Sequence, residues 1–536
     1  LVSFLVGAFR GKAWSYMKNT KKLFALVLAL VLVFTVFAGC SGGGESSTGD
    51  SSTAGDSGTD SGESGDALPA LDTSEEVELV MYFISDRPAK YDEIEANFNE
   101  LFKEKLNCTL RTEWIAWSDY ANKYPLLFSS GEKFDLAYTA TWLGFSNYAS
   151  KGAFMNLDEL WPTYAPNNYA LQSETALTQA TLDGHLYVIP TLLATYSAYG
   201  PYYRTVFDDG AATYEGEVTN WEDYEAYMEW VQANTSISQP YGLSSSGSEI
   251  DDMFFTTKGR YNIRGTSWLS VDPYADTFTL VPNYENEYAM ELLEMTKRWS
   301  DKGFWSKSAL SDTDTTKVQN GIAATDIHNV DSYQSRYIDQ PDWGFKYTNF
   351  VEDVSNLPFT QDACVIPTTS ENPERALALW DYITTDEEAY RAFVYGIEGT
   401  SYEIIDGQVK MINTDDYAGT GMWSARTSEF NLDSYGSPED ISEMKADWDA
   451  YIEKTGNHQS QYLSGWVPDT TSIETEYAAC TNVIQQYWWP LECGFTEDLE
   501  AGLEEYATQM KAAGAEKVIE TLQAQLDAYC EEHPQG

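Results

Sequence analysis

Strands and helices alternate between residues 76 and 140, and this pattern most narrows the folds open to the chain. Glu76–Ser85, Cys108–Ile115 and Lys133–Ala140 are short runs of β-branched and aromatic residues, which predicts buried strands. Between them, Tyr91–Leu106 carries apolar residues at helical spacing, and residues 117–132 predict a second helix. This order favours a parallel sheet with helices on its faces, in which ligands bind beyond the carboxyl ends of the strands.

A basic and then apolar segment precedes this region. Residues 17–22 contain a methionine and three lysines, and Leu23–Phe37 is apolar up to the small residues before Cys40. This is typical of a bacterial export signal cleaved before Cys40. A membrane anchor is the less favoured alternative, because a helical span needs roughly 20 apolar residues. Residues 1–16 precede the only plausible start methionine, and we expect them to be an over-extended gene start.

The stretch that follows Cys40 is built from small and acidic residues. Ser41–Asp66 has no large apolar side chain, so it cannot bury enough surface to offset the entropy of ordering it. We expect residues 40–75 to be a disordered tether. About 30 residues of such a chain reach roughly 30 Å.

Composition limits the function of the rest of the chain. The remaining length is enough for two large lobes or three small domains. The formal net charge of −52 argues against nucleic acid as a partner. Five cysteines besides Cys40 occur without CxxC spacing, so we expect no disulfide framework, although Cys480 and Cys493 could pair. The histidines are far apart and the common catalytic motifs are missing, so we expect neither a metal site nor a cofactor.

A further helix is predicted near the C-terminus. Ala513–Glu532 has apolar residues at helical spacing, which predicts an amphipathic C-terminal helix docked on a lobe.

Several segments follow the pattern of one protein family. They are Ser130–Leu136 (SGEKFDL), Ser150–Leu160 (SKGAFMNLDEL), Asp183–Thr191 (DGHLYVIPT), 219–231 (TNWEDYEAYMEWV) and Ala363–Glu403. Together they resemble the extracellular solute-binding proteins of bacterial ABC importers, in the sugar-binding branch. The resemblance implies a helix over residues 219–231, with Thr219 or Asn220 as its cap. Phe37-Ala38-Gly39-Cys40, at the end of the apolar segment, resembles the lipobox of bacterial lipoproteins, in which the cysteine is lipidated. Tyr395–Gly399 followed by Tyr402 is characteristic of large Gram-positive lipoproteins of this kind.

The resemblance implies a two-lobed, periplasmic-binding-protein-like α/β fold. Each lobe is expected to hold a mainly parallel sheet flanked by helices, and two or three hinge crossovers join the lobes. The N-terminal lobe is expected to comprise residues 76–190 with 363–410, and the C-terminal lobe residues 191–362 with 411–536. Residues 1–39 are the expected over-extended start and signal peptide. The hinge stretches are expected at Val188–Thr195 and Leu357–Ala363.

The resemblance also implies a function without catalysis. A monomer, lipid-anchored through Cys40 to the outer face of the cytoplasmic membrane, would capture an oligosaccharide between its lobes and deliver it to an ABC permease. A peptide-binding lipoprotein of the same architecture is an open alternative, and a secreted glycoside hydrolase is a weaker one. The many acidic residues cannot separate these classes, because some pair of carboxylates will always be close.

We expect the ligand-binding side chains to come from loops after the strands and from the crossovers. Sugars present flat apolar faces ringed by hydroxyl groups, which suit aromatic planes together with carboxylates. The candidates are Ser85, Asp86, Thr141, Trp142, Tyr196, Tyr199, Tyr202, Asp362, Trp423 and Trp466. Trp142 is the foremost candidate and Asp362 the second, while Trp423 and Trp466 are expected to contribute from the second lobe.

Overall fold

The computed structural model describes residues 68–536 apart from short gaps. The gaps are residues 118, 246–248, 264–265, 267, 352–353, 418–421, 456–462, 464–465, 467 and 534–536. The expected export signal, Cys40 and most of the tether lie outside the described residues. Among the helices that the structure describes, none combines the length and the apolar character that a membrane span requires.

A five-stranded sheet forms the centre of the first core. Its order is β2-β1-β3-β15-β6, with β1 (Val77–Ile84), β2 (Cys108–Ile115) and β3 (Leu136–Thr139) parallel to one another. β15 (Ala363–Val365) returns from a distant part of the chain and pairs antiparallel with β3 and with β6 (Ile189–Pro190). The three strands expected from the sequence are therefore confirmed, together with the parallel pairing of β1 with β2 and β3.

Helices cover this sheet because each places an apolar stripe on it. α2 (Tyr91–Leu106) buries Ile94, Phe98 and Phe102, as its spacing predicts. α3 (Tyr120–Ser129) lies within the second predicted helix. The other helices around this core are α4 (Phe145–Ser150), α5 (Leu160–Tyr164), α6 (Pro166–Leu171), α7 (Glu174–Ala180), α12 (Pro373–Thr385), α13 (Glu387–Val394) and α14 (Thr414–Tyr417).

The second core is built on a smaller sheet with the order β13-β7-β14. β7 (Tyr199–Tyr203) pairs antiparallel with both β13 (Thr325–Asn329) and β14 (Lys346–Tyr347). The expectation of a mainly parallel sheet is wrong for this sheet. The chain leaves the first core into β7 and heads back towards it after β14, so these strands run in opposite directions.

Helices supply most of the second core. They are α8 (Trp221–Asn234), α9 (Ile250–Thr257), α10 (Ala289–Asp301), α17 (Glu474–Val483), α18 (Trp489–Glu492), α19 (Leu499–Ala512) and α20 (Ala515–Glu532). α11 (Val330–Asp339) and α15 (Glu439–Thr455) pack with Tyr202 and Tyr347 of the second sheet in a smaller adjoining cluster, which belongs to the same side of the molecule as the second core. The Asn220 side chain accepts a hydrogen bond from the Asp223 amide and caps α8, as expected. α20 buries Val518, Leu522 and Leu526, which confirms the predicted docking of the C-terminal helix. Cys480 and Cys493 are buried free thiols and form no disulfide.

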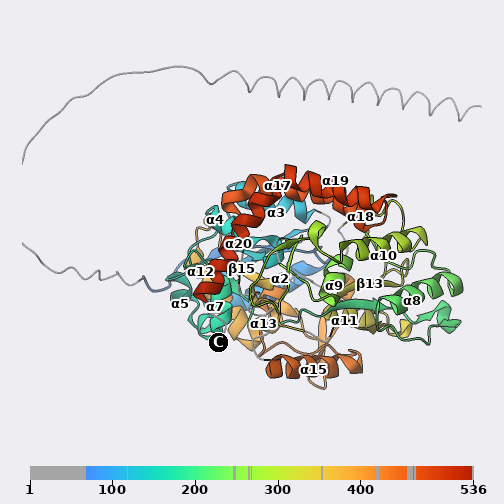
Figure 1. Cartoon of the computed structure of the whole chain (residues 1–536). Coiled ribbons are helices and arrows are strands. Elements are labelled where there is room, and N and C mark those ends of the chain that lie inside the picture. The colour runs from blue at the N-terminus through green and yellow to red at the C-terminus, as the bar shows by residue number, and fades with distance from the viewer. Residues whose placement is uncertain are drawn as a thin grey trace, which may run out of the picture. The chain divides into compact units, whose positions relative to one another are not determined.

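Small sheets of two or three short strands lie outside the two main sheets. They are β4 (Thr181–Leu182) with β5 (His185–Leu186), β8 (Val206–Phe207) with β9 (Ala212–Thr213), β16 (Tyr402–Ile405) with β17 (Gln408–Met411), and the three-stranded set β10 (Tyr261–Asn262), β11 (Leu269–Val271) and β12 (Val281–Pro282). Figure 1 shows α5, α7 and α12 of the first core at one end of the described unit, and α8 and α10 of the second core at the other.

Three chain segments lie side by side between the two cores. The Leu357 amide donates to the Thr195 carbonyl at 2.8 Å, and the Thr191 amide donates to the Phe359 carbonyl at 3.1 Å. The Leu192 amide donates to the Arg426 carbonyl at 2.9 Å, which adds a third segment. The expected hinge stretches therefore run next to each other. Further backbone hydrogen bonds join the same segments, from the Ser197 amide to the Ser355 carbonyl at 2.8 Å and from the Ser428 amide to the Leu192 carbonyl at 3.3 Å. Segments that cross side by side between two cores in this way are suited to bending between them.

Candidate functional site

Five aromatic side chains gather where strands of the first core end. They are Trp117, Tyr120, Tyr138, Trp142 and Trp423, here called the aromatic group. Trp117 follows β2, Tyr138 belongs to β3 and Trp142 lies in the short helix η1 (Thr141–Leu143) directly after β3. The carboxyl ends of parallel strands meet at one edge of a sheet, so these residues are brought together there. Trp423 arrives from η7 (Met422–Ala425), far along the chain.

The indole rings of this group stack loosely and keep part of their surface exposed. The ring centroids of Trp117 and Trp142 are 6.2 Å apart with planes inclined by 27°, and Trp423 lies 5.9 Å from Trp117. All three indoles are half-buried, whereas Tyr138 beneath them is only 1% exposed. Half-buried aromatic planes are suited to bind the apolar face of a ligand, because one side is already held in place by packing.

A charged group of three residues, Asp331, Asp362 and Arg426, adjoins the aromatic group. The Tyr138 hydroxyl donates to Asp362 Oδ1 at 2.6 Å and so connects the two groups. Arg426 Nη1 lies 3.8 Å from Asp362 Oδ2, and Arg426 Nη2 lies 3.4 Å from Asp331 Oδ2. Asp362 precedes β15 and Asp331 lies in the first turn of α11, so Arg426 bridges side chains of both cores.

Burial sets the electrostatics of this group. It raises the pKa of the Asp362 carboxyl above its ordinary value, and the Arg426 guanidinium and the Tyr138 hydroxyl partly offset the rise. Burial also raises the pKa of Tyr138, and the nearby Asp362 raises it further. Tyr138 therefore keeps its proton and acts as a donor to Asp362.

Two tyrosines that follow the first crossover, Tyr196 and the β7 residue Tyr199, extend the site towards the second core. The Tyr196 hydroxyl donates to Asp449 of α15 at 2.8 Å, and its ring lies 5.2 Å from that of Trp448. Burial, followed by the Asp449 carboxylate, raises the pKa of Tyr196. The half-buried ring of Tyr199 lies 5.9 Å from the His328 ring.

The structure places the polar candidates near the first core with different degrees of exposure. Thr141 is buried, and its hydroxyl donates to the Thr360 carbonyl at 2.9 Å, which ties η1 to the second crossover. Ser85 is 1% exposed directly after β1, while the neighbouring Asp86 is exposed. Of the three, Asp86 is thus the side chain with the most surface available for a ligand.

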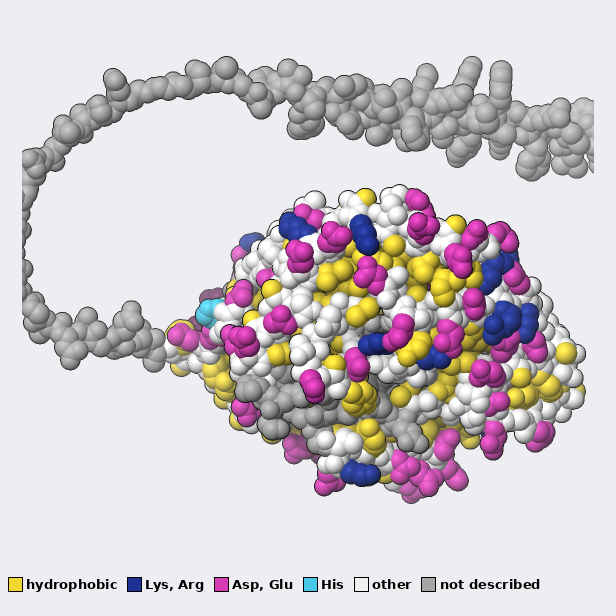
Figure 2. Space-filling view, in the orientation of Figure 1, with side chains coloured by type: hydrophobic (Ala, Val, Ile, Leu, Met, Phe, Trp, Pro, Cys, Tyr) yellow, Lys and Arg dark blue, Asp and Glu magenta, His cyan; other side chains and the backbone are white. Residues whose placement is uncertain are grey.

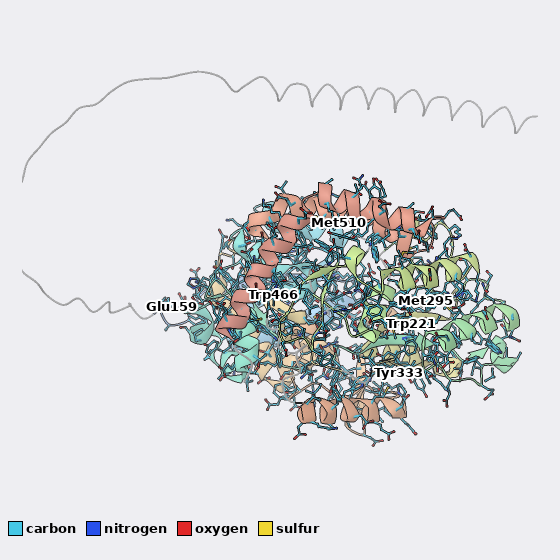
Figure 3. All side chains as sticks on the ribbon, in the orientation of Figure 1. Glu159, Trp221, Met295, Tyr333, Trp466 and Met510 are labelled. Atoms are coloured by element: carbon cyan, nitrogen blue, oxygen red, sulfur yellow. The ribbon has the colours of Figure 1, made fainter. Side chains whose placement is uncertain are left out.

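Two aromatic candidates lie inside other clusters of the protein. Tyr202 packs within the layer between the second sheet and α15, and Trp466 is 8% exposed inside the second core. Figure 3 labels Trp466 together with Met295 and Met510 of the same core. Trp423 was expected on the second lobe but packs against the first core. The binding roles of all these candidates stay predictions.

Sequence reasoning missed several members of the site. Trp117 and Tyr120 follow β2 just as Trp142 follows β3, so the rule that selected Trp142 could have found them. Tyr138 lies within a strand and has no local signal of function. Asp331 and Arg426 carry no sequence signal either, because only the fold brings them next to Asp362.

Comparison with known proteins places this geometry in a family. The family model described as "Bacterial extracellular solute-binding protein" matches residues 96–402. A domain of unknown function, DUF3502, matches residues 462–531. This range contains α17, α18, α19 and all of α20 but its last residue. A carbohydrate ABC transporter substrate-binding protein of Streptococcus pneumoniae serotype 4 is 25% identical over 87% of this chain and 93% of its own length.

Solved structures with low sequence identity share the fold. The N-glycan transport solute binding protein NgtS from Streptococcus pneumoniae, in complex with Man1GlcNAc, has a TM-score of 0.69 at 19% identity and covers 85% of this chain and all of its own. The alginate-binding protein AlgQ2 has a TM-score of 0.58 at 14% identity and covers 86% of this chain and all of its own. The expected two-lobed α/β fold is confirmed. The chain belongs to the bacterial extracellular solute-binding proteins, a family that works outside the cytoplasm in ABC transport and is normally not catalytic.

Proposed function

We propose that this protein binds an oligosaccharide beside the aromatic group and delivers it to the membrane permease of an ABC importer. One observation carries the proposal: three half-buried indoles adjoin carboxylates next to the segments that join the two cores. Indole planes suit the apolar faces of sugar rings, and carboxylates accept hydrogen bonds from sugar hydroxyls. The name of the Streptococcus pneumoniae relative and the glycan bound by NgtS are in line with this ligand class.

Binding alone is sufficient for this role, and we propose that the protein is not an enzyme. A ligand shifts an equilibrium between open and closed lobes by its differential affinity for the two states. Trp142 and Asp362 would contact the ligand from the first core, and Asp331 and Tyr199 from the second. The lobe boundaries drawn from the sequence at residues 190 and 362 are part of this proposal. The last change of lobe, expected from the sequence at residue 410, is proposed to follow residue 425 instead, because Tyr417, Met422 and Ala425 pack in the first core.

The proposal includes a lipid anchor on the cell surface. Cys40 would be acylated, and the tether after it would let a monomeric binding unit move close to the permease on the outer face of a Gram-positive membrane. Substituting Cys40→Ser and following the protein between membrane and medium tests the anchor. Release of the variant into the medium is expected, whereas equal retention of both proteins would contradict it.

Ligand binding is tested by calorimetry on the purified protein with neutral oligosaccharides and short peptides. A micromolar ligand corresponds to about −8 kcal/mol, and a hundredfold excess over the dissociation constant adds about 2.7 kcal/mol to the free energy of unfolding. Binding of one glycan series without shortened products in mass spectrometry is the expected result. Binding of peptides alone would reassign the protein to peptide import, and shortened glycans would identify a hydrolase.

A further inference from the structure

Arg426, the cation of the charged group, is already paired with the two carboxylates of that group. Arg426 lies between Asp331 at 3.4 Å and Asp362 at 3.8 Å, and its side chain is only 20% exposed. Tyr196, whose hydroxyl donates to Asp449, is within electrostatic reach of both Asp449 and Asp331. Among the described residues of these contacts there are three carboxylates, those of Asp331, Asp362 and Asp449, and one guanidinium, that of Arg426, that could bind an anion.

Neighbouring cations at the strand ends are also paired. Arg87, just beyond β1, contacts Asp92 at 2.7 Å and Glu95 at 3.1 Å. Lys123 of α3 contacts Asp119 at 2.8 Å. An anionic ligand would have to break one of these ion pairs to gain a cation, and the displaced carboxylate would then repel it.

The N-terminus of α11 is likewise occupied. The Asn329 side chain accepts a hydrogen bond from the Ser332 amide at 3.0 Å, and Asp331 places a carboxylate in the first turn. The first turn is where a helix attracts negative charge. The Asp331 carboxylate already offsets the partial positive charge at this end of α11, so the helix would stabilise an anionic ligand only weakly.

Two wider features add to the repulsion of anions. The faces of aromatic rings carry the negative part of the ring quadrupole, so a carboxylate above an indole is disfavoured. The whole chain has a formal net charge of −52, and Figure 2 shows Asp and Glu side chains spread over the visible face.

From these observations we propose that the site selects neutral oligosaccharides and rejects glycans that carry carboxylates, such as uronate or sialate units. This inference rests on the proposed function and narrows its ligand class. Neutral sugars need only apolar ring faces and hydroxyl groups, which the indoles and the carboxylates serve without any free cation. A carboxylated sugar of the same shape meets carboxylates and cations that are already ion-paired, and is repelled.

The test compares matched pairs of ligands. Each neutral oligosaccharide of a panel is titrated by calorimetry beside its counterpart in which primary alcohols at C6 are oxidised to carboxylates. We expect the oxidised form to bind at least tenfold more weakly. We also expect this ratio to shrink when salt is raised from 10 mM to 500 mM, because salt screens repulsion between charges.

Two variants of α11 assign the effect to the charged group. Asp331→Asn removes one carboxylate beside Arg426, so the affinity ratio between the neutral and oxidised ligands should fall at least threefold. Asp339→Asn is the control: it makes the same change of charge on the same helix, about 12 Å further along at 1.5 Å per residue. This separation exceeds the screening length of about 10 Å at 0.1 M salt, so the ratio should stay unchanged.

The outcomes separate the inference from the function on which it rests. Equal or tighter binding of the oxidised glycans overturns the inference and leaves glycan binding intact. An equal change of the ratio in Asp331→Asn and Asp339→Asn also overturns it. If Asp331→Asn does not fold, the salt dependence of the unaltered protein decides, and a ratio that is constant with salt counts against the inference. Absence of binding by every member of both sets contradicts the proposed function and the inference together.

Discussion

The aromatic group and the tryptophans of the second core use the same residue type in opposite ways. Trp299 of α10 is fully buried, and its indole N–H donates to Glu225 at 2.8 Å. Trp305 is 2% exposed, and its N–H donates to the Cys493 carbonyl at 3.0 Å. The indoles of Trp117 and Trp142 instead remain half-buried at strand ends. With 17 tryptophans in the chain, exposure and position separate a ligand-binding ring from a core ring, and abundance does not.

The largest expected effect comes from the second core. Trp299→Ala should lower the free energy of unfolding by about 3–5 kcal/mol, because it leaves a cavity among Trp221, Tyr224 and Phe304. Denaturant unfolding measures the change, and Trp299→Phe should lose less. The folded fraction should bind ligand with unchanged affinity. A loss below 1 kcal/mol would remove the distinction between the two regions.

The next effect concerns binding and belongs to the aromatic group. Trp142→Ala should weaken ligand binding at least tenfold, which is about 1.4 kcal/mol, because a central aromatic contact is lost. Its cost in stability should stay below that of Trp299→Ala, since the ring is only half-buried. Calorimetry and denaturant unfolding on the same samples provide both values. Trp142→Phe, which keeps a ring, is the control, and unchanged affinity in Trp142→Ala would exclude this residue from the site.

An acid-dependent effect is expected near Trp299. Burial would raise the pKa of Glu225, but hydrogen bonds from Arg298, Lys302 and Trp299 outweigh it and lower the pKa from 4.5 to about 2. The unfolded chain thus takes up the proton first as pH falls. The stabilisation is present above pH 4.5 and is lost as pH falls towards 2.

Glu225→Gln should therefore flatten the dependence of stability on pH within this window. Unfolding midpoints between pH 2 and pH 6 measure it, and Arg298→Gln should flatten the same range because it removes a partner of Glu225. A variant whose profile parallels that of the original protein would show that the ion pairs around Glu225 do not stabilise the second core.

The smallest effect tests whether the second core can be weakened without touching the site. Asn220→Ala removes the cap of α8 and should cost about 1 kcal/mol of stability. Ligand affinity should stay the same, because α8 belongs to the second core and not to the aromatic group. Asn220→Ser, which restores a capping oxygen, should recover most of the loss. A changed ligand affinity in Asn220→Ala would show that the stability of the second core and binding at the aromatic group are coupled.

Much of the first core could be predicted because its signals are local. Periodicity located β1, β2, β3 and α2 to within a few residues, and the rule for parallel sheets led to Trp142. The same reasoning could not tell that Trp466 is a core residue, because the sequence around it shows no apolar periodicity that would place it on a buried face. The family resemblance implied a mainly parallel sheet in each lobe, but β7, β13 and β14 pair antiparallel, and these short strands are far apart along the chain.

The sequence by itself determined the elements whose residues are neighbours along the chain: the strands and helices of residues 76–140, the cap of α8 and the apolar stripe of α20. Only the tertiary structure decided that Trp423 joins Trp117 and that Arg426 lies between Asp331 and Asp362. The reason is physical. Periodicity records how one element buries its own face, whereas a site at the crossovers depends on long-range pairing of distant segments.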